Sequence, residues 1–171
     1  MTDKRSKTQL LVLGGGPGGY PAAFLAADLG MAVTLVDAKP NPGGICLFEG
    51  CIPSKTLLHA AKLINEMADA SKMGLTCQRP QVDLDRLRDF KNGVVGKLTG
   101  GLGVLKTKRH VNFVRGQGTI ASPHSVVVQL QEGGQETIEF ESLIIATGSS
   151  PARLPFLDYN SPHVWDSTAA L

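Results

Sequence analysis

The sequence predicts an α/β fold with a parallel sheet, a two-helix insertion and a small antiparallel β segment. A short apolar run leads into a glycine-rich turn, an alanine-rich stretch and a second apolar run. Two long stretches with helical spacing of apolar residues follow, and short apolar runs broken by glycine or proline come after them. Strands that alternate with a helix at the start favour a parallel sheet.

Length and composition narrow the class of protein. The chain has 171 residues, of which 42% are hydrophobic and 19% charged, as in an ordinary soluble globular domain. Its net charge of +2 is too small to indicate a nucleic acid or a membrane surface as partner. No apolar run is long enough to cross a bilayer, and no signal-peptide core follows the basic N-terminus. A cytoplasmic location is therefore expected.

The first part of the chain has the pattern of a βαβ unit. Residues 1–8 are expected to form a mobile tail. Residues 9–13 are nearly all apolar, which is typical of a buried parallel strand. Residues 20–29 predict a helix closed by Gly30, and residues 32–36 predict a second strand. Strands joined in this way lie parallel, with a right-handed crossover.

The turn between the first strand and the helix carries a dinucleotide-binding fingerprint. Gly14, Gly16 and Gly19 match the pattern G-x-G-x-x-G. Such glycines allow a tight turn, a close approach of a pyrophosphate and close helix–strand packing. Asp37 ends the second strand, where a carboxylate can accept hydrogen bonds from ribose hydroxyls. The turn, the helix and the acid together predict a Rossmann-like dinucleotide site.

Two helices and a set of strands are expected after this unit. A helix over residues 52–73 ends at Gly74, and a second helical pattern covers residues 84–105. Glycines weaken the second pattern, so its C-terminal half is expected to be irregular. The final strand, over residues 143–148, is expected to return beside the first. Short strands are predicted over residues 111–115, 118–121, 125–130 and 137–140, with a hairpin tip at Gly133-Gly134.

Two cysteines, Cys46 and Cys51, lie in the loop before the first long helix, with glycines on both sides. Pro53 suits the first turn of a helix, which places Cys51 at a helix N-terminus. The partial positive charge there stabilises a thiolate, and a nearby pair of thiols can form and exchange a disulfide. The alternative is a zinc site with the two cysteines as ligands, but the other nearby candidates, His59 and Cys77, do not have the spacing of a zinc site. We therefore predict a redox pair and no metal.

Several motifs resemble the class I pyridine nucleotide-disulfide oxidoreductases. The motifs are Gly14 to Tyr20, Gly43 to Lys55, Thr99-Gly100-Gly101-Leu102, Ala146-Thr147-Gly148-Ser149, Leu154-Pro155-Phe156 and Trp165-Asp166-Ser167-Thr168. The Cys51 to Lys55 ending most resembles the branch that oxidises dihydrolipoamide. The resemblance implies an FAD-binding domain with a redox disulfide over residues 9–150. It also implies that residues 151–171 link this domain to an NAD-binding domain.

The resemblance implies roles for single residues. Cys46 would exchange with a dithiol substrate, and Cys51 would lie against the flavin of FAD. Lys55 would stand beside the flavin ring, where a positive charge favours the reduced, anionic form. The implied cofactor-binding residues are Gly14, Gly16, Gly19, Asp37, Gly44, Lys55, Gly118, Thr147 and Gly148, with Gly118 at the adenine end.

The reaction implied by the resemblance is oxidation of dihydrolipoamide by NAD through FAD and a Cys46–Cys51 disulfide. Its partner would be the lipoyl-bearing protein of a 2-oxo acid dehydrogenase complex, and the family forms homodimers. The chain has no second dinucleotide fingerprint and no histidine in the family's acid–base motif. It is therefore expected to be the FAD portion of a larger enzyme and to be inactive alone.

Two residues depart from the family pattern. Phe48 and Glu49 stand between the cysteines, where an Asn-Val pair or similar is expected. Glu49 pointing inward would oppose ionisation of a thiol, so it is expected to face solvent. Two other functions stay open: a related reductase of glutathione, another disulfide or mercuric ion, and a stand-alone FAD or redox module without NAD chemistry.

Overall fold

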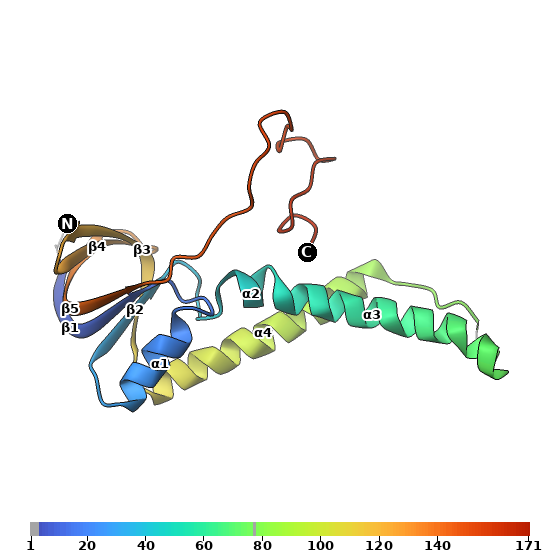
Figure 1. Cartoon of the computed structure of the whole chain (residues 1–171), viewed down its shortest axis with the longest axis horizontal. Coiled ribbons are helices and arrows are strands. Elements are labelled where there is room, and N and C mark those ends of the chain that lie inside the picture. Colours follow the sequence, from blue (N-terminus) through green and yellow to red (C-terminus); the bar gives the residue numbers. More distant parts are fainter. Residues whose placement is uncertain (1–3, 77) are drawn as a thin grey trace.

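The computed structural model describes residues 4–76 and 78–171. The strands gather at one end of the molecule, and two long helices extend away from them side by side (Figure 1). In chain order the elements are β1 (Lys4–Leu13), α1 (Tyr20–Asp28), β2 (Val33–Asp37), α2 (Gly44–Phe48), α3 (Cys51–Asp69), the 3-10 turn η1 (Ala70–Met73), α4 (Leu84–Lys108), β3 (Asn112–Ser122), β4 (Ser125–Leu130) and β5 (Gln135–Ile145).

The strands form one sheet that closes into a barrel in the order β1–β2–β3–β4–β5. β2 and β5 run parallel to β1 on its two sides, and β3 runs parallel to β2. β4 runs antiparallel to both β3 and β5 and closes the barrel between them. The predicted α/β fold class is therefore confirmed, and the last strand lies beside the first as expected.

The predicted parallel sheet and the predicted antiparallel segment share strands. Residues 112–115 of β3 pair with β2, and the rest of the same strand pairs with β4. β5 likewise contains residues from two strands that were predicted separately, over residues 137–140 and 143–148. Gly116 lies inside β3 and does not end a strand. A side-chain carbon at this position would collide with the carbonyl oxygen of Gln129 on β4. This glycine permits a close approach of two backbones inside one strand.

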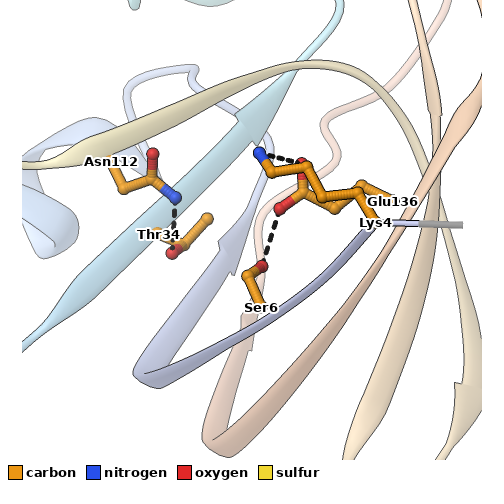
Figure 2. A network of polar contacts seen from close by, with 5 residues as sticks. All are labelled: Lys4, Ser6, Thr34, Asn112 and Glu136. Carbon is orange, nitrogen blue, oxygen red and sulfur yellow. Dashed lines mark hydrogen bonds and ion pairs between the residues drawn. The ribbon is translucent and has the colours of Figure 1, made fainter. Parts of the chain in front are cut away.

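The N-terminal segment belongs to the barrel. Residues 4–8, expected to be mobile, form the start of β1 and pair with β5; Met1 to Asp3 lie outside the described residues. Glu136 of β5 is 2% exposed, and its contacts explain why residues 4–8 pair with β5. Its carboxylate pairs with the Lys4 ammonium at 2.9 Å and accepts a hydrogen bond from the Ser6 hydroxyl at 2.7 Å (Figure 2). A buried carboxylate needs such partners, and β1 supplies them.

Both faces of β1 are buried, which explains its apolar sequence. Leu10 and Val12 face α1, where they pack with Phe24. Leu11 and Leu13 point into the barrel, where they join apolar side chains from the other strands. Strands covered on both faces have near-continuous apolar runs, as residues 10–13 do.

The first long helix, expected over residues 52–73, is α-helical only as far as Asp69 and ends in the 3-10 turn η1, whereas the second is more regular than expected. α4 runs for 25 residues without interruption, so the expected irregular second half is wrong. Asp83 caps its N-terminus by accepting hydrogen bonds from the N–H groups of Asp85 and Arg86. Gly103 lies beside the loop before α2, where a side-chain carbon would require the Asn41 amide group to move. Gly74 ends η1 in the left-handed conformation, at φ +83°, as predicted.

No helix among residues 4–76 and 78–171 has both the length and the apolar character needed to cross a membrane. The helical pair leaves several large apolar side chains exposed, among them Leu58, Leu63, Met67, Phe90 and Val104.

Replacing Glu136 tests the role of the buried carboxylate. Glu136→Ala should lower the free energy of unfolding by about 1–3 kcal/mol, because Ser6 and Lys4 lose their common partner. Urea denaturation followed by circular dichroism measures the change. Glu141→Ala, at an exposed position of the same strand, is the control and should change the value by less than about 0.5 kcal/mol. Equal effects of the two substitutions would contradict this assignment.

Candidate active site

Two of the three fingerprint glycines are required by the packing of the chain itself. Gly14 has φ +99° and donates its N–H to the Val36 carbonyl at 2.8 Å. A side-chain carbon at Gly14 would collide with the carbonyl oxygen of Ala146, and one at Gly19 with that of Gly14. These glycines therefore let the end of β1, the start of α1 and the segment after β5 come together.

Gly16 differs from its two neighbours in the fingerprint. A side-chain carbon there would lie 3.7 Å from the Gly44 Cα, which is an ordinary contact. The packing of the chain alone therefore does not require glycine at this position. Close approach of a ligand is the remaining reason in the fingerprint.

The N-terminus of α1 has the features of a pyrophosphate site. The helix begins at Tyr20 after Gly19, and no side chain caps it. The Tyr20 N–H already donates to the Gly16 carbonyl at 3.0 Å and Pro21 has no N–H, so these two positions offer no free donor. The helix dipole still favours a negatively charged group such as a phosphate at this end. The turn and the helix therefore fit a dinucleotide such as FAD.

Asp37 lies at the end of β2, as predicted, and is half-buried. Its Oδ2 atom accepts a hydrogen bond from the Gly15 N–H at 2.6 Å, and its Oδ1 atom accepts one from the Lys39 N–H at 2.7 Å. An ionised carboxylate has about four acceptor sites. Asp37 is thus fixed in place and keeps acceptor capacity for ribose hydroxyls.

The two cysteines lie close together as free thiols. Cys46 is in α2, and Cys51 is the first residue of α3, the helix N-terminus that Pro53 predicted. The pKa of the Cys46 thiol is raised, first by its side-chain hydrogen bond with Cys51, then by burial and by the charge of Cys51. The Cys51 backbone and the Lys55 ammonium lower the pKa of Cys46 in part. Two interacting thiols of this kind can form a disulfide.

The loop that carries the thiols is docked on the fingerprint turn. The Gly43 N–H donates a hydrogen bond to the Gly15 carbonyl at 2.8 Å. Gly44 has φ +57°, and a side-chain carbon there would collide with the Gly16 Cα. The predicted site residue Gly44 thus brings the start of α2 against the proposed pyrophosphate turn.

Lys55 is exposed on α3, one turn after Cys51. It borders a shallow apolar groove between α3 and α4, with Ile52 on its own helix and Phe90 and Val94 on the other. Its ammonium is close enough to lower the pKa of Cys46. The position is consistent with the predicted role beside a flavin, which stays a prediction.

The remaining predicted cofactor residues lie near the turn or in the barrel. Thr147 and Gly148 are exposed and follow Ala146, whose N–H donates to the Leu13 carbonyl at 2.7 Å. Gly118 lies in β3, and a side-chain carbon there would be 2.9 Å from Leu13 Cδ2. Barrel packing therefore suffices to explain Gly118, and its contact with adenine stays a prediction.

Glu49 does not face solvent as expected. It is half-buried and forms an ion pair with Lys39, whose ammonium also lies 5.6 Å from the centre of the Phe48 ring. Lys39 is not among the predicted site residues, because nothing in the sequence relates this loop lysine to a residue ten positions later. Its proximity to two unusual residues becomes visible only in the structure.

No cluster of residues that could hold a metal ion occurs in the described part of the chain. Cys77, considered as a zinc ligand and expected to be an ordinary thiol, lies outside the described residues.

Comparison with known proteins identifies the family to which the chain belongs. The pyridine nucleotide-disulphide oxidoreductase family matches residues 8–170, and the chain belongs to this family. Among similar proteins are dihydrolipoyl dehydrogenases of Haemophilus influenzae (46% identical over 98% of this chain), Vibrio parahaemolyticus (44% over 98%) and Haloferax volcanii (46% over 99%). The chain spans 35–36% of the length of these relatives. The family resemblance found in the sequence is therefore confirmed.

The raised pKa of Cys46 can be tested through its main cause. Cys51→Ala removes the hydrogen bond and the neighbouring charge, so the pKa of Cys46 should fall and more thiolate should form at neutral pH. The pH dependence of Cys46 alkylation by iodoacetamide measures this pKa. Ser54→Ala, which leaves both thiols in place, is the control. An unchanged or higher Cys46 pKa in Cys51→Ala would refute the assigned cause.

Proposed function

We propose that this chain binds FAD and carries the redox dithiol of an enzyme that oxidises dihydrolipoamide with NAD. The docking of the thiol loop on the fingerprint turn supports this proposal most directly. The pyrophosphate of a dinucleotide bound at the turn would lie beside Gly16 and Gly44, on the N-terminal side of α3, the helix that carries Cys51. The similarity to dihydrolipoyl dehydrogenases supports the substrate.

The proposed thiol chemistry is a two-electron exchange. A substrate thiolate attacks Cys46 Sγ in the disulfide and releases Cys51 as a thiolate; the second substrate thiol then displaces Cys46. The substrate loses two electrons and two protons and becomes a cyclic disulfide, and the Cys46–Cys51 pair gains them. The N-terminus of α3 stabilises the released Cys51 thiolate. FAD, when bound, supplies the two-electron chemistry that connects the dithiol with NAD.

The other residues bind and orient the cofactor in this proposal. Gly14, Gly16 and Gly19 line the pyrophosphate, Asp37 binds the ribose, and Lys55 places its positive charge beside the flavin. The other proposed cofactor-binding residues are Gly118, Thr147 and Gly148.

Residues 9–150 were expected to form the FAD-binding unit; because β1 begins at Lys4, we propose that the unit covers residues 4–150 and that residues 151–171 link it to an NAD-binding domain. The proposed partners are a lipoyl-bearing protein of a 2-oxo acid dehydrogenase complex and a second copy of the enzyme. The cytoplasm, where thiols stay reduced between turnovers, is the proposed location.

Gly16→Ala tests the pyrophosphate site without disturbing the fold. Its added carbon makes only an ordinary contact with Gly44, so the unfolding curve should not change. FAD should bind about tenfold more weakly or worse, a loss of at least about 1.4 kcal/mol. Titration followed by flavin fluorescence measures the affinity. Gly93→Ala is a matched control, because its added carbon faces open space. Unchanged FAD affinity in Gly16→Ala would be incompatible with the proposed site.

Cys51→Ser tests the role of the inner thiol. The FAD-loaded chain should gain a long-wavelength absorption band when one equivalent of dihydrolipoamide is added, because the Cys51 thiolate then contacts the flavin. Cys51→Ser should retain FAD and lose the band. Absorption spectra before and after the dithiol distinguish the two cases. Loss of FAD from Cys51→Ser would instead assign this cysteine a structural role.

A further inference from the structure

Lys39 contacts both unusual residues that separate the two cysteines. Its ammonium forms an ion pair with Glu49 and lies 5.6 Å from the centre of the Phe48 ring. Its backbone N–H donates to Asp37 Oδ1 at 2.7 Å, which ties the lysine to the end of β2. The lysine therefore connects the loop between the thiols with the strand end that is proposed to bind the ribose.

Glu49 places a carboxylate within the segment that joins the thiols. It follows Cys46 by three residues and precedes Cys51 by two. Its backbone N–H donates to the Ile45 carbonyl at 2.9 Å, which holds the residue at the end of α2. An unpaired carboxylate in this position would disfavour a thiolate at either cysteine. The cation that lowers the pKa of Cys46 is Lys55, which follows the cysteines in sequence, whereas Lys39 precedes them.

The Lys39–Glu49 pair is more sheltered than the comparable pair on α3. The side chains of Lys39 and Glu49 are 40% and 30% exposed, against 70% and 57% for Lys62 and Glu66. Solvent and salt therefore screen the Lys39–Glu49 pair less. The Phe48 ring under the ammonium adds a cation–π contact on the same side.

We propose that Lys39 is a positioning residue of the dithiol site: it neutralises Glu49 and packs on Phe48, so that the loop between the cysteines stays in place without a free negative charge. The inference rests on the proposed function, which gives the two thiols their redox role. It assigns to this chain a compensating pair, Lys39 with Glu49, in place of the neutral residues that the family pattern has between its cysteines.

Four variants separate charge from shape: Lys39→Met, Glu49→Gln, the double variant and Lys62→Met. The measurement is the rate of alkylation of each cysteine by iodoacetamide at neutral pH, resolved by mass spectrometry. Lys39→Met should lower the alkylation rate of the faster-reacting thiol by about three- to tenfold. This is the effect expected of one unpaired, partly screened carboxylate, that of Glu49, on a nearby thiolate. The double variant should react at least as fast as the wild type, because the carboxylate is gone. Lys62→Met, which breaks the exposed pair with Glu66, should react as the wild type does.

The direction of the change in alkylation rate distinguishes neutralisation of Glu49 by Lys39 from mere mechanical support of the loop. If Lys39 only held the loop in place, Lys39→Met would expose the thiols and speed alkylation, and Glu49→Gln would not correct it. That result, or an unchanged rate in Lys39→Met, would overturn the inference.

A second experiment tests the proposed function separately. Glutathione disulfide should oxidise the wild-type pair: Cys46 and Cys51 lose two electrons and two protons, their sulfurs form one bond, and two glutathione thiols are released. Failure of the wild type to form this disulfide would refute the redox role. The alkylation rates would still report the charge effect of Lys39, so the two failures are distinguishable.

Discussion

The contact of Gly44 with Gly16 fixes the relation between the thiols and the turn at the end of β1. A side-chain carbon at Gly44 would collide with the Gly16 backbone, and the adjacent Gly43 N–H hydrogen bonds to Gly15. The loop can therefore lie directly on the turn only because residue 44 is glycine, whereas a side-chain carbon at Gly16 would make an ordinary contact. α2 begins at Gly44 and places Cys46, and α3 begins soon afterwards at Cys51 and carries Lys55.

The barrel gives this contact a rigid base. The turn projects from the end of β1, which pairs with β2 on one side and with β5 on the other. Neither edge of β1 is therefore free, and the apolar residues of β1 pack on both of its faces. Ala146, just after β5, packs on Gly14 and so couples the last strand to the fingerprint. A precisely placed site is better supported by strands than by loops, since their hydrogen bonds and packing restrict motion.

Local sequence patterns predicted the features that depend on neighbouring residues. The fingerprint glycines, Asp37 at a strand end and Cys51 at a helix start each follow from short spacing rules. The joining of predicted strands into β3 and β5 depends instead on distant partners, which short runs of sequence do not contain. The regularity of α4 also escaped prediction. Each helical glycine costs about 1 kcal/mol relative to alanine, which is why an irregular second half was expected, but the glycines do not interrupt α4.

Glu49 shows why a departure from a family pattern has to be judged with its surroundings. Considered alone in the sequence, a carboxylate between two redox thiols opposes their ionisation. In the fold, the loop after β2 passes beside α2, and Lys39 on that loop meets the carboxylate. The lysine's backbone is fixed by Asp37, so its position is set by the same strand end that orients the proposed ribose site. An acidic residue can therefore be accommodated between the cysteines because the βαβ unit places a cation opposite it.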